Sequence, residues 1–338
     1  MKQFNLCMLG FGNVGRALAR LLVAKREEMR ALYGIEWRIT GVATRRMRWL
    51  VSPEGFDVEK LLSGEVAAQS PPLPPRDARE WLHMASADVL FETTSLEPHT
   101  GEPAVSHIRA ALDGGAHAVT TNKGTIVHAY RELNELARAR GRRFMFEATV
   151  ADCLPVFSLF RETLPAAKLL GFGGVLNSTT SIILEEMERG ATFDDGVRAA
   201  QSLGVTETDP AYDVDGWDAT VKVCALASVL MNAPLKPADV RREGIRNLDA
   251  AEVRAARASG TPLRLVARAR RAEDGSLDAF VRPERIPRDD AFSTITGTSL
   301  MIRFELDVLP ALSLIAHGPD LQSTAYGMLA DFINAVRQ

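Results

Sequence analysis

The chain has 338 residues, of which 46% are hydrophobic and 25% are charged, and its formal net charge is −3. This composition is typical of a globular protein with a full core, built as one large domain or two ordinary ones. The near balance of charge gives no bias toward nucleic acid or membrane partners, and no apolar run in the sequence reaches the roughly 18 residues that span a bilayer.

The cysteines indicate a reducing compartment. Cys7, Cys153 and Cys224 are odd in number, far apart, and set among apolar residues. This pattern favours buried, reduced thiols over a disulfide framework. The N-terminal residues lead straight into a strand-like run and lack the features of a secretory signal. We therefore expect a cytoplasmic protein.

A glycine-rich turn follows the first predicted strand, residues 4–9, and precedes a helix predicted over residues 16–30. Gly10 would permit the tight bend, Gly12 would let the backbone approach a pyrophosphate, and Gly15 would let the helix pack on the strand. The helix N-terminus offers N–H groups to phosphates. The alternative is a plain turn between a strand and a helix, but the strand–turn–helix context favours a dinucleotide site.

The second predicted strand, residues 37–43, ends in a basic turn. Arg45 and Arg46 follow it, and Arg48 lies just beyond. A site for NAD usually has an acid here that binds the ribose 2′-hydroxyl. Arginine can instead pair with a 2′-phosphate. We therefore expect NADP in preference to NAD, the alternative being a solvated arginine loop.

Two more predicted strands, residues 87–91 and 117–119, end in polar loops. Thr94 lies in the hydroxyl-rich loop after the first, and Lys123 follows the second. The carboxyl ends of parallel strands face the ligand crevice of such a sheet, so we expect Lys123 beside the cofactor rather than in an ordinary solvated loop. Helices are predicted over residues 103–114 and 130–140.

A strand predicted over residues 144–150 ends with a carboxylate. Glu147 there is poorly solvated and needs a cation, an amide cluster or a bound ion as partner. Hard ions suit the carboxylate and carbonyl oxygens of such a turn. Cys153 has two interpretations, a nucleophile as in aldehyde-oxidising dehydrogenases or a buried thiol, and the second is favoured.

A run of small polar residues, 177–181, follows the predicted strand 168–175. It could serve only as the cap of a helix over residues 182–188, or it could also line a polar pocket. A second helix, residues 193–203, has Thr192 as its candidate cap.

Later elements suggest a mixed sheet, with a helix predicted at 250–259, strands at 262–271, 278–282, 292–306 and 309–317, and a last helix at 323–336.

The stretch from Gly204 to Lys222 is the most informative. Five acids in it precede the lysine: Glu207, Asp209, Asp213, Asp215 and Asp218. The apolar run 223–231 predicts a buried helix, so Asp218 and Lys222, four residues apart, should share one face at its entrance. An acidic loop before a half-buried Asp–Lys pair suits a substrate ammonium group, the alternative being a solvated acidic turn.

Lys222 suggests a mechanism by itself. When a hydride adds to an aldehyde carbon, the oxygen becomes an alkoxide and needs a proton, which a lysine ammonium can give. A lysine acts as an acid near neutral pH only if desolvation or another cation, such as Lys123, lowers its pKa. Asp218 would oppose that effect while orienting the lysine.

These motifs, in this order and along nearly the whole chain, resemble homoserine dehydrogenase. They are Gly10–Gly15, Thr120–Lys123, Glu147–Val150, Gly174–Thr180 and Gly204–Lys222. The spacing of acids and lysine in the last is the most specific. The resemblance is to short members without a C-terminal regulatory ACT domain, and we expect no feedback inhibition through such a domain.

The resemblance implies an α/β fold in three parts. These are an N-terminal Rossmann dinucleotide-binding domain over residues 1–145, an α/β catalytic and dimerisation domain with a mixed sheet over 146–317, and a C-terminal helix over 318–338 that returns to the first domain. It also implies a homodimer. The implied reaction is NAD(P)-dependent interconversion of L-aspartate 4-semialdehyde and L-homoserine, in the threonine, methionine and isoleucine pathway.

The resemblance also assigns roles to residues. Lys222 would donate the proton, with Lys123 the other candidate, and Asp218 would bind near the reacting oxygen. Glu207 would hold the substrate amino group. The other implied substrate positions are Asp213 and Thr179. The positions expected to bind the cofactor are Gly10, Gly12, Asn13, Val14, Gly15, Arg45, Thr94, Lys123, Gly204 and Gly318. Those expected to hold a sodium-type cation are Glu147, Val150, Asp152 and Leu154.

Three turns depart from the family pattern, at Asp152, Ser181 and Asp320. They bear on the substrate and the cation site more than on the fold. Two alternatives therefore stand beside homoserine dehydrogenase. One is a relative that reduces another small aldehyde or ketone. The other is a non-catalytic nucleotide-binding relic, against which the joint retention of the predicted acids and lysines argues.

Overall fold

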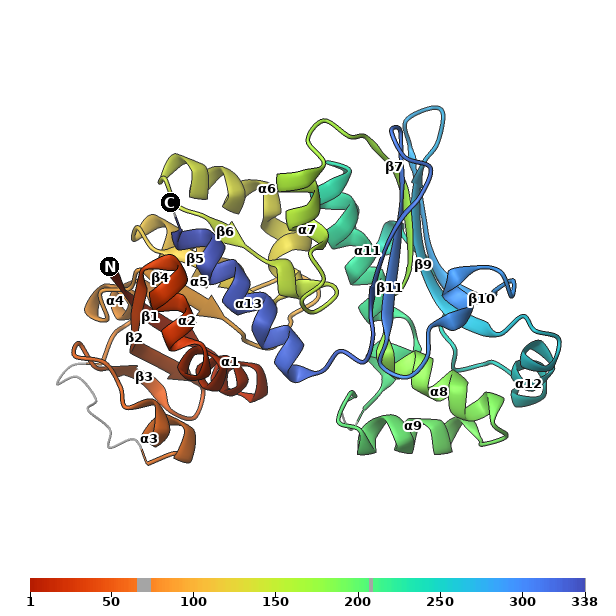
Figure 1. Cartoon of the computed structure of the whole chain (residues 1–338), viewed down its shortest axis with the longest axis horizontal. Helices are drawn as coiled ribbons and strands as arrows, with labels where there is room; N and C mark the ends of the chain where they lie inside the picture. The colour runs from red at the N-terminus through yellow and green to blue at the C-terminus, as the bar shows by residue number, and fades with distance from the viewer. Residues whose placement is uncertain (66–73, 207–208, 338) are drawn as a thin grey trace. The chain divides into compact units, whose positions relative to one another are not determined.

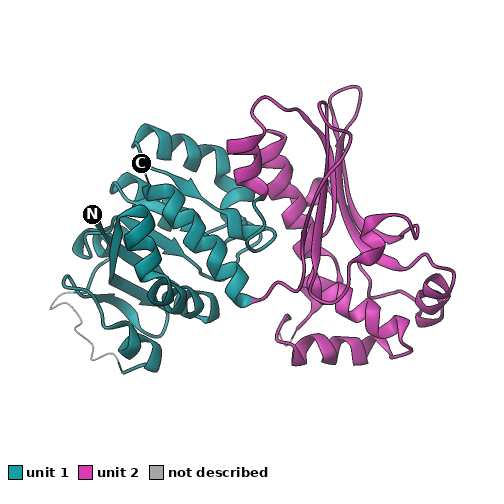
Figure 2. Cartoon of the chain, in the orientation of Figure 1, with its two compact units in different colours: residues 1–155, 321–338 teal, residues 156–320 magenta. Residues whose placement is uncertain are grey.

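The computed structural model describes residues 1–65, 74–206 and 209–337, which form two compact units (Figure 2). Unit 1 comprises Met1–Pro155 and Leu321–Gln338, and unit 2 comprises Val156–Asp320. Unit 1 thus continues beyond the predicted boundary at residue 145. It does so because the segment after residue 145 packs on the last helix, where Asp331 accepts the Glu147 N–H at 2.7 Å.

Unit 1 contains a six-stranded sheet in the order β3-β2-β1-β4-β5-β6 (Figure 1). All neighbours are parallel except β3, which is antiparallel to β2. This order reverses between β1 and β4, the point at which a Rossmann fold binds a dinucleotide, so the predicted fold class is confirmed. The strands are β1 (Lys2–Leu9), β2 (Ile35–Thr44), β3 (Arg48–Val51), β4 (Val89–Glu92), β5 (His117–Thr120) and β6 (Phe144–Met145).

Helices cover both faces of this sheet. The alternating residues of β1 enter two different cores, since Leu6 and Met8 pack in one and Cys7 and Leu9 in the other. The helices are α1 (Asn13–Ala24), α2 (Arg26–Tyr33), α3 (Val58–Ser63), α4 (Ala78–Met84), α5 (Ala104–Asp113), α6 (Lys123–Ala139) and α13 (Leu321–Val336). The helix predicted over residues 16–30 is therefore two helices, separated at Lys25.

The strand predicted over residues 144–150 is much shorter than expected. β6 ends at Met145, and Glu147–Thr149 form a 3₁₀ turn. The Glu147 N–H cannot join a strand ladder because it donates to Asp331 of α13. A tertiary contact has therefore replaced the strand.

Unit 2 contains a second six-stranded sheet, in the order β12-β11-β7-β9-β10-β8. Its pairs are antiparallel except β8 with β10, which makes the sheet mixed, as predicted. The strand expected at 292–306 begins only at Leu300, because the Asp290 side chain caps a 3₁₀ turn at Ala291–Thr294. The strands are β7 (Leu169–Val175), β8 (Arg241–Arg242), β9 (Leu263–Arg271), β10 (Leu277–Arg285), β11 (Leu300–Leu306) and β12 (Leu312–Ala316).

Two helices of unit 2 begin at predicted polar caps. Asn177 caps α8, and Thr192 forms a capping box with Asp195 at the start of α9. The helices are α7 (Val156–Ser158), α8 (Ser178–Glu188), α9 (Phe193–Ser202), α10 (Ala211–Val214), α11 (Trp217–Leu230) and α12 (Ala250–Ala258). In the described ranges, no helix combines the length and apolar character needed to cross a membrane.

Candidate active site

The glycine turn between β1 and α1 contains two glycines that the fold requires. Gly10 has a φ of +92°, and a Cβ there would lie 2.6 Å from the Thr93 carbonyl oxygen. A Cβ at Gly15 would lie 2.6 Å from the Gly10 carbonyl oxygen. Side chains at either position would therefore clash with the backbone, so both glycines have a structural reason.

No steric requirement of the fold explains the glycine at position 12. Its φ of −82° suits any residue, and a Cβ there would meet no atom of the described residues within 4 Å. The structure therefore leaves open the space beside the Gly12 backbone. This is the position at which a dinucleotide pyrophosphate approaches a Rossmann turn.

The N-terminus of α1 also favours an anion. Within the described ranges no side chain caps it, and its first turn carries no acid. By contrast, Asp57 caps α3 and Asp77 caps α4. The first N–H groups of α1, beginning at Asn13 and Val14, are thus available to a phosphate.

The basic turn lies between β2 and β3. Arg45 and Arg46 are exposed there, and neither forms an ion pair with any residue the structure describes. The Thr44 hydroxyl accepts the Met47 N–H at 2.8 Å and shapes the turn. The arginines therefore stand at the carboxyl end of β2, where the predicted contact with a 2′-phosphate would form.

A buried carboxylate closes β4 and was not predicted as a site residue. Glu92 is fully buried and accepts hydrogen bonds from the N–H and hydroxyl of Thr94 and, at 2.9 Å, from the Thr120 hydroxyl. Burial raises the pKa of Glu92, and these hydrogen bonds oppose the shift. The Thr94 hydroxyl, predicted to bind cofactor, thus holds Glu92. The available signal was an acid ending an apolar strand.

Asn122 joins the loops that follow β4 and β5. Its side-chain oxygen caps α6 at the Gly124 N–H, and its amide nitrogen donates to the Thr94 and Ser95 carbonyls at 3.3 and 3.4 Å. Lys123 is the first residue of α6. The two loops predicted to face the cofactor are therefore connected to each other at the carboxyl edge of the sheet.

In unit 2, one amide bridges two carboxylates. Asn177 donates to Asp213 at 2.7 Å and to Asp218 at 3.0 Å, while its oxygen accepts the Thr180 N–H at 2.9 Å. The second oxygen of Asp213 accepts hydroxyl hydrogen bonds from Thr179 and Thr206, at 3.1 and 3.0 Å. Asn177 was predicted only as part of a polar run; it both caps α8 and organises the acids.

Lys222 completes this cluster. Its ammonium lies 2.9 Å from Oδ2 of Asp218, and both side chains are only 12% exposed. The same ammonium donates to the Leu176 carbonyl at the end of β7. The predicted pairing of Asp218 and Lys222 on one face of a helix is therefore present, although α11 begins earlier than the apolar run, at Trp217.

The closeness of the Asp213 and Asp218 carboxylates affects the pKa values of the cluster. Burial, followed by the negative charge of Asp218, raises the pKa of Asp213, while hydrogen bonds from Asn177 and the two threonines lower it. The hydroxyl oxygen of Tyr212 is buried and has no hydrogen-bond partner among the described residues. Burial, then Asp218 and Asp213, also raise the pKa of Tyr212, so its hydroxyl keeps its proton.

The structure groups the predicted residues within each unit. Unit 2 brings together Thr179, Asp213, Asp218 and Lys222, and unit 1 holds the glycine turn and Lys123. Glu207 lies outside the described residues. Gly204, after α9, and Gly318, after β12, both have positive φ angles, of 70° and 60°. Their roles toward the cofactor stay predictions.

The segment predicted to hold a cation lies in unit 1. Glu147 is buried in its 3₁₀ turn, and Asp152, with a φ of 54°, accepts the Thr324 hydroxyl. Across the described ranges, no group of three or more His, Cys, Asp or Glu side chains could hold a metal ion. Among the described residues the three cysteines form no disulfide, as expected, but Cys153, in the turn after Asp152, is only half-buried.

Comparison with known families identifies the chain. The family model for the homoserine dehydrogenase NAD-binding domain matches residues 10–147, and the homoserine dehydrogenase model matches residues 155–333. The chain belongs to the homoserine dehydrogenase family. The family match spans both units, so the resemblance read from the motifs is confirmed.

Individual relatives cover almost the whole chain. An NAD(+)-dependent homoserine dehydrogenase of Pseudomonas canavaninivorans is 33% identical over 99% of this chain and 96% of its own length. A homoserine dehydrogenase structure from Thiobacillus denitrificans has a TM-score of 0.83 at 29% identity and covers 99% of this chain and 73% of that one. A hyperthermophilic archaeal homoserine dehydrogenase in complex with NADPH has a TM-score of 0.81 at 27% identity, covering 99% and 98%.

Proposed function

We propose that the chain catalyses the NAD(P)-dependent interconversion of L-aspartate 4-semialdehyde and L-homoserine. The observation that carries the proposal is the buried cluster of Asp213, Asp218 and Lys222 bridged by Asn177. Membership of the homoserine dehydrogenase family supports the assignment. The open space beside Gly12 and the uncapped start of α1 fit a dinucleotide in unit 1.

The acids of unit 2 would bind the ammonium group of the substrate. Asp213 and Asp218 are close enough for one amide to hydrogen-bond both, and their mutual repulsion contributes to the raised pKa of Asp213. Lys222 neutralises one negative charge directly. A second cation would relieve the remaining repulsion, and the ammonium group of an amino-acid substrate supplies one.

Lys222 would transfer the proton. When bound, the reduced nicotinamide supplies a hydride to the aldehyde carbon. The oxygen then takes a proton from the Lys222 ammonium, which Asp218 and the Leu176 carbonyl orient. In the reverse direction the lysine accepts the hydroxyl proton. Lys123 in unit 1 is the second candidate for the same step.

The assay that tests this function follows NAD(P)H oxidation by the purified protein with aspartate 4-semialdehyde and a panel of other small aldehydes and ketones. We expect turnover with aspartate 4-semialdehyde to exceed that with every other carbonyl compound. Preference for another compound would favour the alternative reductase. Binding of NADPH without turnover of any compound would indicate a relic.

We propose that NADP is preferred to NAD. The support is the exposed Arg45–Arg46 turn and the lack of an acid among residues 44–46, where NAD sites place one. The relatives differ in cofactor: the Pseudomonas enzyme is named NAD(+)-dependent, and the archaeal structure is a complex with NADPH. Arg45→Ala should lower kcat/KM for NADPH more than for NADH, whereas exposed Arg20→Ala on α1 should change neither.

We also propose a weakly held monovalent cation at Glu147. One carboxylate with the carbonyls of Val150, Asp152 and Leu154 is a low-charge oxygen set, and so suits a monovalent better than a divalent ion. Activity in sodium, potassium and choline chloride at equal ionic strength tests this. Equal rates in all three salts would exclude a required cation.

The last part of the proposal is a homodimer formed through the sheet of unit 2. Leu170 of β7 and Ile315 of β12 are 41% and 39% exposed, and Val308 between β11 and β12 is 71% exposed. Exposed apolar side chains on strands of one sheet favour an interface. Light scattering with size-exclusion chromatography should give twice the chain mass of 36.9 kDa, and Leu170→Glu should reduce it.

A further inference from the structure

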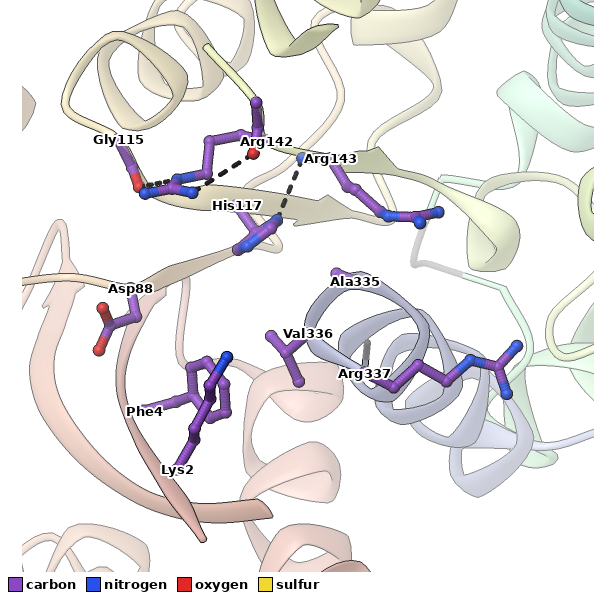
Figure 3. A pocket seen from close by; sticks show the side chains of 11 residues that line it. Lys2, Phe4, Asp88, Gly115, His117, Arg142, Arg143, Ala335, Val336 and Arg337 are labelled. Carbon is purple, nitrogen blue, oxygen red and sulfur yellow. Dashed lines mark hydrogen bonds between the residues drawn. The ribbon is translucent and has the colours of Figure 1, made fainter. Parts of the chain in front are cut away.

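A basic pocket lies in unit 1, at the edge of the sheet where the parallel strands begin (Figure 3). Its volume is about 480 Å³. Lys2 starts β1 and His117 starts β5, while the glycine turn and Lys123 follow the ends of these strands. At about 3.3 Å per residue, the eight residues of β1 separate the pocket from the glycine turn by roughly 25 Å.

Positive charge dominates the lining. Lys2, Arg142, Arg143 and Arg337 contribute four cations, and Asp88 contributes one carboxylate. Asp88 already accepts the Asn5 N–H at 2.8 Å. None of the four cations forms an ion pair with a residue in the described ranges 1–65, 74–206 and 209–337. Within the described residues, the positive charge of the pocket is therefore largely uncompensated.

Hydrogen bonds hold part of this charge in place. Arg142 donates to the Gly115 carbonyl (Figure 3). It also donates to the Gly141 carbonyl, at 3.3 Å. These neutral acceptors position the guanidinium without neutralising it. The first residues of the strands, together with Val336 at the end of α13 and the next residue, Arg337, line a concave and positively charged surface.

The pKa of His117 responds to the positive charges of the pocket. Its Nδ1 accepts the Arg143 N–H at 3.1 Å, so a neutral ring carries its proton on Nε2 and can donate from there. Burial, followed by the charges of Arg142 and Arg143, lowers the pKa of His117 to about 4. An anion in the pocket would oppose these charges and favour the protonated ring.

We propose that this pocket binds a small anion carrying a phosphate group, at a site separate from the dinucleotide. Guanidinium groups match phosphate oxygens in charge and in paired hydrogen bonds. The volume lies within the usual range of small-molecule sites, about 300–1,000 Å³. The concave shape and the net charge of −3 for the whole chain favour a small molecule over nucleic acid.

Binding can be measured with inorganic phosphate and pyrophosphate against chloride at equal ionic strength, by calorimetry and thermal unfolding. Both phosphates should bind and raise Tm. Lys2→Glu and Arg143→Glu should weaken binding at least tenfold, whereas Arg20→Glu, an equal charge reversal at an exposed position of α1 outside the pocket, should not. Equal effects of chloride and phosphate, or equal binding by all three variants, would overturn the proposal.

A second measurement locates the anion. The imidazole pKa of His117, followed by NMR, should rise from about 4 when phosphate is added, and Lys2→Glu should reduce that rise. Phosphate could also occupy the start of α1. Binding that persists in Lys2→Glu and Arg143→Glu but is lost with NADPH would assign the anion to the dinucleotide site and refute the proposal. These readouts do not depend on turnover, so they stand apart from the proposed activity.

Discussion

Lys222 holds its ammonium 2.9 Å from Oδ2 of Asp218, one turn earlier on α11. Because both side chains are mostly buried, solvent and salt screen this interaction less than they would at the surface. Helical spacing by itself brings the two residues together. The Leu176 carbonyl, from the end of β7, then fixes the ammonium in position.

Lys222→Ala should lower kcat by about 10²–10⁴-fold, the usual contribution of a positioned general acid. NADPH binding, measured by fluorescence titration, should persist because the dinucleotide turn belongs to unit 1. Lys236→Ala, at an exposed position of the same unit, is the matched control. A near-normal kcat for Lys222→Ala in a folded protein would transfer the proton step to Lys123.

Gly12→Ala separates ligand binding from folding. A Cβ at Gly12 meets no described atom within 4 Å, so the free energy of unfolding should stay within about 1 kcal/mol of the wild type. The methyl group would occupy the space next to a pyrophosphate, and dinucleotide affinity should fall roughly tenfold or more, about 1.4 kcal/mol. Chemical denaturation and NADPH titration measure the two quantities.

Gly15→Ala is the contrasting variant. Its Cβ would lie 2.6 Å from the Gly10 carbonyl oxygen, so it should destabilise the protein by about 1–3 kcal/mol. If Gly12→Ala unfolds as readily as Gly15→Ala, the space beside Gly12 is needed by the fold. If it keeps full affinity, the dinucleotide does not approach there.

Local sequence patterns predicted most of the fold. Apolar runs located most strands of both sheets, although the short strands β3 and β8 were not predicted. Thr192 was predicted correctly as a helix cap. One failure came from a long-range contact. Glu147 was assigned to a strand, but its N–H bonds Asp331, 184 residues away, and nothing in the local pattern predicts that partner.

The site shows the same division. The Asp218–Lys222 pair follows from a four-residue spacing and could be predicted. The bridge from Asn177 to Asp213 and Asp218 joins residues 36 and 41 positions apart. The polar run that contains Asn177 was interpreted as a helix cap that could also line a polar pocket, but the local sequence could not identify the two acids that Asn177 bridges.

Asp213→Asn should change stability in a pH-dependent way. Burial and the Asp218 charge raise the pKa of Asp213 above its unfolded value. Between the two pKa values the folded state holds a proton that the unfolded state lacks, so the free energy of unfolding falls as pH rises through this interval. The variant removes that cost. Its Tm relative to wild type should therefore be more favourable at neutral pH than below about pH 3.9.

Thermal unfolding across this pH range measures the effect, with Asp194→Asn, an exposed acid on α9, as the control. Asp213→Asn should also raise KM for aspartate 4-semialdehyde, since it removes a negative charge from the proposed ammonium site. A Tm difference that does not vary with pH would show that Asp213 is not strained by burial. An unchanged KM would remove Asp213 from the substrate site.

Tyr212→Phe tests an unpaired hydroxyl beside the acid cluster. The oxygen is buried without a hydrogen-bond partner in the described part of the chain. Removing a buried, unsatisfied polar group is neutral or stabilising, so the free energy of unfolding should stay equal or rise. If the hydroxyl donates to bound substrate, KM should rise about 2–13-fold, equivalent to about 0.5–1.5 kcal/mol, while kcat changes little.

Tyr33→Phe is the control, because Tyr33 is 46% exposed and lies in unit 1. A loss of 1 kcal/mol or more in Tyr212→Phe, by the scale of an ordinary hydrogen bond, would mean that the protein itself satisfies the hydroxyl. Unchanged stability together with unchanged KM would leave the hydroxyl without a role toward substrate. Only the combination of preserved stability and raised KM identifies Tyr212 as a substrate-binding residue, at a position where the family motif of acids and lysine had given no reason to look.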